Sequence, residues 1–395
     1  MMWPRSDVNI CKCNKNSLYK VNMKCSGIVH SDFSNYGDCF FCAAQEVVEY
    51  ILERGFVGEL DCYFFPVAYL YRHSLELKLK AIAFKNNSEA GGEFIRDTFH
   101  NLSAILKYIT PFITAQVKAD QYAYDWLGLL FDDMNQIDKD SDAFRYPFKI
   151  RMFKDEVFGY KYYDIQKLFD GQKYIDLIAF ANKMELSFQI LCSYYNEDQK
   201  EFKECRGYNT VFLEEGGEYR YQSVIGYNYG KDFYGPMVKG YIESAEYFAD
   251  KIVKKPEFKD KYFLPMCYLF RNGLELELKQ IWFEECGYGF RTRCEKLHGC
   301  KHSFKKLWNL IQNDLATHTE HENDKSVIGY AEEYIKQFHS LDCSSSVFRY
   351  PVDKNVKYHF KRDKYLDSRN MGECFTELSE FLQAVDAMMN DHNQY

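Results

Sequence analysis

Hydrophobic and polar residues follow one another along much of this chain with the spacing of an α-helix. In residues 69–84, YLYRHSLELKLKAIAF, the apolar side chains of Leu75, Leu79 and Ile82 recur every three to four positions. Leu75, Leu77 and Leu79 also alternate as in a strand, but the segment is rich in the helix formers Leu, Glu and Lys. No β-branched residue precedes Ile82, which also disfavours a strand. We therefore predict a helix.

The same pattern returns in residues 268–283, YLFRNGLELELKQIWF, where ten of the sixteen positions are identical. Two further landmarks repeat in the same order. HNLSAILKYI (100–109) corresponds to HSFKKLWNLI (302–311), and MNQIDKDSDAFRYP (134–147) to FHSLDCSSSVFRYP (338–351). The offset grows only from 199 (69 to 268) to 202 (100 to 302) and 204 (134 to 338). Such ordered self-similarity predicts an internal duplication, whose members we call the first and second repeat.

Each repeat is predicted to be a bundle of about four helices. The first helix is expected at about 39–54 and 238–254, with Asp38 as N-cap and Gly55 at the end of the first of these. The Leu-Glu-Leu helix follows, then a third helix between the His and Phe-Arg-Tyr-Pro landmarks. The fourth is expected at about 164–194 and 371–390. The fold class that follows is mainly α.

Between the repeats the character of the sequence changes. NTVFLEEGGEYRYQSV alternates apolar and polar residues around Gly216-Gly217, which predicts a β-hairpin, and IGYNYGKDFYGP after it predicts a Gly- and Tyr-rich loop. The predicted division of the chain is an N-terminal extension of irregular or strand structure (1–38), a first bundle (39–194), a linker with the hairpin (195–236) and a second bundle (237–395).

Composition narrows the class of protein. With 46% hydrophobic and 27% charged residues, the 395-residue chain is typical of a globular protein. Its net charge of −8 excludes a general coat for nucleic acid, so any RNA contact requires a local basic patch. No window of eighteen apolar residues predicts a membrane span, and MMWPRSDVNICKCNK lacks the apolar core of a signal peptide. We expect a cytoplasmic protein without membrane contact.

The fourteen cysteines are spaced irregularly, which favours reduced cytosolic thiols over a disulfide framework. Cys11 and Cys13 with Cys39 and Cys42 offer the thiolates for a zinc site. However, Cys39 and Cys42 begin the first predicted helix, and no pair of CxxC elements has matched spacing. We predict neither a metal nor a cofactor.

Charged residues form a stripe on the repeated helix. Arg72, Glu76 and Lys80 recur at i, i+4 and i+8 with apolar residues on both sides, and the second repeat has Arg271, Glu275 and Lys279 in their place. Charges set among apolar residues must be paired. Two interpretations remain open: an intrahelical ion-pair network that fixes packing, and a cleft that binds an anion. Position 78, which is Lys in the first repeat and Glu277 in the second, is expected on the solvent face.

The other two landmarks carry groups suited to chemistry. His100 and His302 lie just ahead of an apolar periodic run in each repeat, as capping residues or as proton-transfer groups. In Phe-Arg-Tyr-Pro, Arg145 and Arg349 lie between two aromatic rings at a helix-to-loop break. Such an arginine stacks on the rings, forms a fork on a phosphate, or pairs with the Glu of its own repeat.

Taken together, the Arg-x-x-Leu-Glu-Leu-x-Leu-Lys helix, the His-x-Leu/Phe-x-x-Leu turn and the late Arg-Tyr-Pro resemble the HEPN superfamily (higher eukaryote and prokaryote nucleotide-binding). The resemblance covers most of 39–194 and 237–395. It implies two tandem helical bundles that pair with each other. Many HEPN domains are metal-independent ribonucleases of toxin and phage-defence systems, and others bind nucleotides or partners without catalysis.

One feature departs from the active members of that superfamily, which carry Arg, four to six residues, then His. Neither Arg145 nor Arg349 is followed by His at that spacing; Arg293 and His298 have it, but lie ahead of His302. Two functions are therefore predicted. One is an endoribonuclease in which His100 or His302 transfers protons and Arg145 and Arg349 stabilise the phosphate.

The other is a non-catalytic module that recognises a nucleotide or a protein partner through the cleft between the repeats. RNA or a nucleotide, and a protein, are the expected partners, and self-association stays open. The Tyr-rich segment 195–236 suits recognition by stacking.

Overall fold

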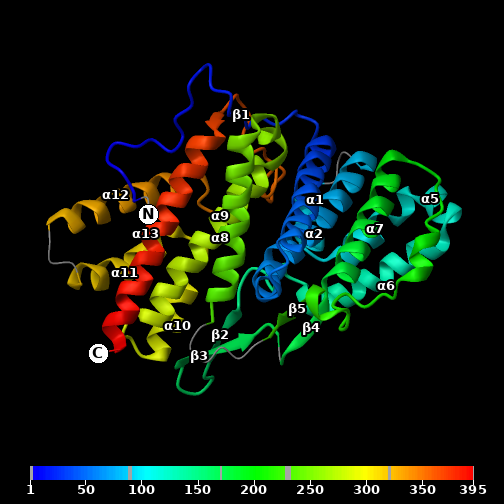
Figure 1. Cartoon of the computed structure of the whole chain (residues 1–395). Coiled ribbons are helices and arrows are strands. Elements are labelled where there is room, and N and C mark those ends of the chain that lie inside the picture. The colour runs from blue at the N-terminus through cyan, green and yellow to red at the C-terminus, as the bar shows by residue number, and fades with distance from the viewer. Residues whose placement is uncertain (1–2, 88–90, 170, 227–232, 319–321, 395) are drawn as a thin grey trace.

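The computed structural model describes residues 3–394 apart from 88–90, 170, 227–232 and 319–321. It is mainly helical, as predicted, and its two sets of helices lie side by side (Figure 1). The first set comprises α1 (Val29–Arg54), α2 (Val57–Asn86), α3 (Gly92–Thr98), α4 (Leu102–Ile109), α5 (Thr114–Ala119), α6 (Gln121–Asp138) and α7 (Leu177–Asn196). The second set comprises α8 (Gly235–Lys254), α9 (Lys259–Gln280), α10 (Phe290–Cys300), α11 (Phe304–Thr317), α12 (Glu322–Leu341) and α13 (Ser368–Gln394). Apart from the short α5, the helices of the two sets follow the same order.

The Leu-Glu-Leu segments are helical in both repeats. Residues 69–84 lie within α2, and 268–283 lie in α9 and the π-helical turn Ile281–Glu285 that continues it. Almost every side chain of α2 from Tyr63 to Phe84 is buried, because other helices pack around it. The prediction that position 78 faces solvent is wrong: Lys78 is 2% exposed and Glu277 3% exposed.

In the described part of the chain, three two-stranded sheets supplement the helices. β1 (Lys20–Asn22) pairs with β6 (Tyr365–Asp367), β2 (Phe148–Lys154) with β3 (Lys161–Lys167), and β4 (Lys173–Asp176) with β5 (Gln222–Ile225), all antiparallel. Two sequence-based predictions about this region are wrong. The fourth helix does not begin near 164, because that stretch forms β3 and β4. No hairpin closes around Gly216-Gly217: β5 pairs with β4 instead, and an isolated bridge joins Ile175 to Glu215. The predicted Tyr-rich loop lies partly outside the described residues.

Where the two sets of helices meet, equivalent residues face each other. Tyr69 of the first repeat stacks on Tyr268 of the second, with ring centroids 4.5 Å apart. Nearby, α8 crosses α2 so closely that a Cβ on Gly240 would come 2.0 Å from the carbonyl oxygen of Cys62. A contact of one residue with its own counterpart is what an approximate twofold arrangement produces.

The N-terminal segment packs on the second set of helices, although it precedes the first in sequence (Figure 1). Arg5 forms an ion pair of 2.6 Å with Glu377, and the Gln337 side chain accepts a hydrogen bond from the Ile10 amide. Helix α1 begins at Val29, with Ile28 as N-cap, so the prediction of Asp38 as the N-cap is wrong. Gly55 does end α1, in the left-handed conformation (φ 66°).

Cys39 and Cys42 therefore lie well inside α1. Among the residues that the structure describes, no group of three or more His, Cys, Asp or Glu side chains is arranged to hold a metal ion. None of the described helices is both long and apolar enough to cross a membrane.

Candidate functional site

Glu76 is completely buried on α2, and four donors converge on its carboxylate. Arg72 Nη1 lies 2.9 Å from Oε2, while Lys80 Nζ lies 2.7 Å and His100 Nδ1 2.9 Å from Oε1. The fourth donor is the hydroxyl of Tyr350, 2.9 Å from Oε1, which comes from the second repeat. The Arg-Glu-Lys stripe is thus an i,i+4 network extended by the His and Tyr of the other two landmarks.

The second repeat builds the same cluster around Glu275. Arg271 Nη1 lies 2.9 Å from Oε2, and Lys279 Nζ lies 2.6 Å and His302 Nδ1 2.9 Å from Oε1. Here the hydroxyl donor is Tyr146 of the first repeat, at 3.0 Å. Each Phe-Arg-Tyr-Pro segment therefore crosses to the other repeat, which was not predicted.

The arginines of these segments do not pair with the glutamates. Arg145 donates from Nη2 to the Tyr146 hydroxyl at 2.8 Å, and Arg349 donates from Nε to the carbonyl of Ser345 at 2.6 Å. The predicted pairing of each arginine with the Glu of its own repeat is wrong, because the tyrosines take that place. Arg145 is 3% and Arg349 7% exposed, so both guanidinium groups lie inside the protein.

The backbone of the crossing segments is also held across the two repeats. His73 donates from Nε2 to the carbonyl of Arg349 at 3.1 Å, and its counterpart Asn272 donates from Nδ2 to the carbonyl of Arg145 at 3.4 Å. Burial keeps the pKa of His73 well below its ordinary value, so this imidazole is neutral and serves as a hydrogen-bond donor.

Electrostatics keep both carboxylates ionised. Burial opposes ionisation of Glu76, but His100, Lys80 and Arg72 outweigh it and hold its pKa well below the ordinary value. Glu275 likewise has a pKa well below normal, because Lys279, His302 and Arg271 outweigh its burial. Burial lowers the pKa of Lys279, although Glu275 opposes that effect.

The two clusters differ in charge balance. In the first repeat, Asp138 lies 3.0 Å from Arg72 Nε, so two cations face two carboxylates. Its counterpart Asp342 makes no ion pair with Arg271 within 4.0 Å in the part of the chain that is described; the Arg271 guanidinium instead lies 3.8 Å above the Phe304 ring. Among the described residues, Arg271 and Lys279 both pair with Glu275 and with no second carboxylate within 4.0 Å. The second cluster therefore has one paired carboxylate fewer than the first.

His100 and His302 also differ in their exposure to solvent. The side chain of His100 is 15% exposed, whereas that of His302 is 40% exposed and borders a pocket of about 390 Å³. Both repeats line this pocket, because β2 and Tyr146 come from the first repeat. Its titratable lining groups are Asp142, Tyr146, Lys149, Tyr234, Lys279, His298, Lys301 and His302.

Within this pocket, which we call the His302 pocket, not every charge is free. Lys149 lies 2.8 Å from Asp140 and 3.5 Å from Asp142, so its charge is compensated. The other two lysines that line the pocket are Lys279, which pairs with Glu275, and Lys301. Glu275 and the Tyr146 hydroxyl occupy Nδ1 of His302, which leaves Nε2 as the ring nitrogen available to a ligand.

Sequence patterns identified the cluster residues but missed part of the pocket. No sequence pattern pointed to Lys149 or Lys301 except that they lie near the Phe-Arg-Tyr-Pro and His landmarks. Arg293 and His298 have the Arg-x4-His spacing, but they do not act together in the structure. His298 lines the His302 pocket, whereas Arg293 donates to the carbonyl of Phe283. Neither Arg145 nor Arg349 lines the pocket.

Comparisons of the chain with protein-family models, with curated proteins and with solved structures found no match.

Proposed function

We propose that the protein is a binding module for a phosphate group, carried by a nucleotide or by single-stranded RNA, which it holds in the His302 pocket. The observation that carries the proposal is that Arg271 and Lys279 share the single carboxylate of Glu275, and that Lys279 lines a pocket open to solvent. Buried cations without matching carboxylates are costly, and an anion at the pocket offsets that cost. In the first repeat, Asp138 supplies the second carboxylate.

The pocket also suits such a ligand in size and in groups. A volume of about 390 Å³ falls in the range of small-molecule sites, ~300–1,000 Å³. Lys279 and Lys301 supply cations, and the half-exposed His302 imidazole lies beside them. The protein as a whole is acidic, so binding is expected to be local rather than along an extended surface.

The test is to titrate the protein with AMP and with a short single-stranded RNA in a calorimeter, which measures the binding affinity. Lys301→Ala and His302→Ala are expected to weaken binding roughly tenfold or more, which corresponds to ~1.4 kcal/mol. His100→Ala, the same change in the first repeat, and Lys107→Ala on the exposed side of α4 are the matched controls and should leave affinity unchanged. Equal losses for His100→Ala and His302→Ala would assign the effect to folding and overturn the proposal.

Metal-independent cleavage of RNA is the second candidate, and the carboxylate-held imidazole favours it. A glutamate on Nδ1 orients His302 so that Nε2 is able to take the proton of a ribose 2′-hydroxyl. Lys279 and Lys301 would offset charge that develops on the phosphate. In this scheme the buried Arg145 and Arg349 position Tyr146 and Tyr350 rather than contact the phosphate.

Cleavage is tested by incubating the protein with single-stranded RNA in EDTA. If His302 transfers the proton, His302→Ala slows cleavage ~10²–10⁴-fold while the protein stays folded by circular dichroism. RNA that binds but remains intact, with and without EDTA, leaves the binding module as the function.

A further inference from the structure

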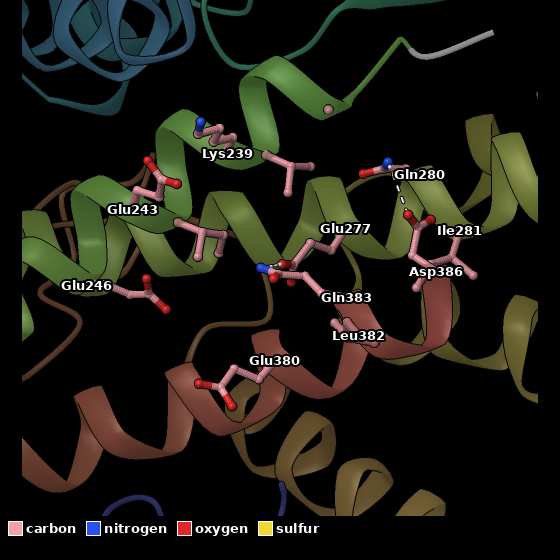
Figure 2. Close-up of a pocket in the computed structure, with 13 residues that line it drawn as sticks. Lys239, Glu243, Glu246, Glu277, Gln280, Ile281, Glu380, Leu382, Gln383 and Asp386 are labelled. Carbon is pink, nitrogen blue, oxygen red and sulfur yellow. Dashed lines mark hydrogen bonds between the residues drawn. The ribbon is translucent and has the colours of Figure 1, made fainter. Parts of the chain in front are cut away.

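A second pocket, of about 490 Å³, lies between α8, α9 and α13 in the second repeat (Figure 2). We call it the acidic pocket because five carboxylates line it: Glu243, Glu246, Glu277, Glu380 and Asp386. Among the described residues that line it, the one cationic residue is Lys239, which is half-exposed and lies 4.0 Å from Glu59 of α2. The His302 pocket and the acidic pocket thus have opposite charge.

Glu277 is the central group of the acidic pocket, and half of its carboxylate is unpartnered. Oε1 accepts hydrogen bonds from the Ser379 hydroxyl at 2.6 Å and from Gln383 Nε2 at 3.1 Å. Oε2 is buried and has no hydrogen-bond partner among the residues that the structure describes. A buried carboxylate oxygen without a donor is costly, so the ionised form of Glu277 lacks a donor at this atom.

The first repeat shows what fits at the same position. Its counterpart is Lys78, which is buried between α1, α2 and α7. The Lys78 ammonium donates to Ser34 Oγ and to Asp38 Oδ1, each at 2.7 Å, and lies 5.0 Å from the Phe188 ring centroid. One repeat therefore supplies an ammonium group from its own chain here. The other offers an acceptor and a pocket.

The carboxylates of the acidic pocket also raise one another's pKa values. Burial raises the pKa of Glu277 to about 8, with Glu246 and Asp386 adding to the effect. Burial likewise raises the pKa of Glu246 to about 7, with contributions from Glu243 and Glu380. Both groups therefore hold protons near neutral pH, and a bound cation would release them.

Carboxylates and apolar side chains both line the acidic pocket. Figure 2 shows Glu246 and Glu380 toward one end, Asp386 toward the other, and Glu277 between them. The apolar lining residues are Val238, Ile242, Ile281 and Leu382. Separated carboxylates in a pocket that also has apolar lining match a chain of ammonium groups joined by short alkyl linkers. A compact metal ion would need three or more ligands at one point, and the described side chains offer no such group.

We propose that the acidic pocket binds a linear aliphatic polyamine, with one ammonium group donating to Glu277 Oε2 and a second lying near Glu246 and Glu380. Spermidine has the required chemistry and is the probe for the test. A polyamine bound here stabilises the contact of α13 with α8 and α9. The proposal is independent of the phosphate site.

The experiment is calorimetric titration of the full chain with spermidine at low salt, in two buffers of different ionisation enthalpy. We expect affinity to rise between pH 6 and pH 8.5 and protons to be released at pH 7, seen as a heat that depends on the buffer. Glu277→Gln is expected to weaken binding roughly tenfold or more. Glu380→Gln provides a second variant whose fold does not depend on a buried group, and Glu257→Gln, an exposed carboxylate outside the pocket, is the matched control.

Three ligands distinguish the alternatives. Butylamine, with one ammonium group, should bind much more weakly than spermidine. Mg²⁺ should not displace spermidine at equal concentration, and displacement would overturn the proposal in favour of a metal site. A lysine-rich peptide that binds in a Glu277-dependent manner while free spermidine does not would overturn it in favour of a protein partner. Unchanged spermidine affinity in both Glu277→Gln and Glu380→Gln would also overturn it.

Discussion

At the scale of single residues, two buried glutamates show how ion pairs are tolerated inside this protein. Glu76 and Glu275 each receive two cations of their own helix, an imidazole and a tyrosine hydroxyl, so both oxygens are satisfied. A buried carboxylate is stable only when cations neutralise its charge and hydrogen-bond donors reach both of its oxygens. The tyrosines, which come from the opposite repeat, complete that requirement.

Removal of Glu76 should be strongly destabilising. Glu76→Ala leaves Lys80 buried without its carboxylate and deprives His100 of its acceptor, so we expect the free energy of unfolding to fall by about 3–5 kcal/mol. Urea denaturation followed by circular dichroism measures it. Glu156→Ala, at an exposed turn between β2 and β3, is the control with an expected change near zero. Equal stability of Glu76→Ala and wild type would contradict the role assigned to the cluster.

Glu277 should make stability depend on pH in the opposite direction to an ordinary paired carboxylate. Its folded pKa of about 8 lies above that of an unfolded chain, ~4.3, so the folded state binds the extra proton between these values. Stability from this group is present below pH 4 and is lost as pH rises to 8, at up to ~1.4 kcal/mol per pH unit. Glu277→Gln, which cannot ionise, should therefore become more stable relative to wild type from pH 5 to pH 8. Parallel pH profiles in urea unfolding would contradict the buried ionisation.

At the scale of elements, the packing of helices between the repeats depends on small residues. Gly240 allows α8 to approach the backbone of α2 at Cys62, where any side chain would collide. Tyr69 and Tyr268 stack across the same two sets of helices. Each Phe-Arg-Tyr-Pro segment reaches the cluster of the opposite repeat.

Gly240→Ala is expected to lower stability by about 1–3 kcal/mol, because α8 must move away from α2. The better helix propensity of alanine, ~1 kcal/mol, offsets only part of that cost. Gly58→Ala in the first turn of α2 is the matched control, since a Cβ there meets no atom within 4 Å and should be neutral or stabilising. Thermal unfolding of the two variants compares them directly, and equal melting temperatures would exclude a tight crossing.

At the scale of the whole molecule, contacts between the repeats are reciprocal. Tyr350 completes the Glu76 cluster, Tyr146 completes the Glu275 cluster, and the N-terminal segment packs on the second set of helices. If one set of helices unfolded alone, the other would be left with a buried carboxylate lacking its tyrosine. The two sets are therefore expected to unfold together.

Differential scanning calorimetry tests this coupling. We expect one transition, with a calorimetric enthalpy equal to the van't Hoff enthalpy. Tyr350→Phe, which removes a bond between the sets of helices without changing the volume of the ring, should lower the midpoint but keep a single transition. Two resolved transitions in the wild type would show that the repeats are independent domains.

The sequence by itself determined the helical class, the repeated Leu-Glu-Leu helix and the members of the charged stripe. These follow from local rules: periodicity, helix propensity and the need to pair charges among apolar residues. Predictions from the sequence were wrong where a segment contacts residues that are distant along the chain. Strands β3 and β4 were predicted as helix, β5 was expected in a local hairpin, and Lys78 was expected in solvent.

Only the tertiary structure decided which groups complete each cluster. The crossing of Tyr146 and Tyr350 depends on how α2, α8 and α9 pack, and no local pattern contains that information. The same holds for the Glu275 cluster, where Phe304 rather than a second carboxylate meets Arg271, and for the unpartnered oxygen of Glu277. Burial and long-range contacts set these properties, since both depend on side chains that the chain brings together only on folding.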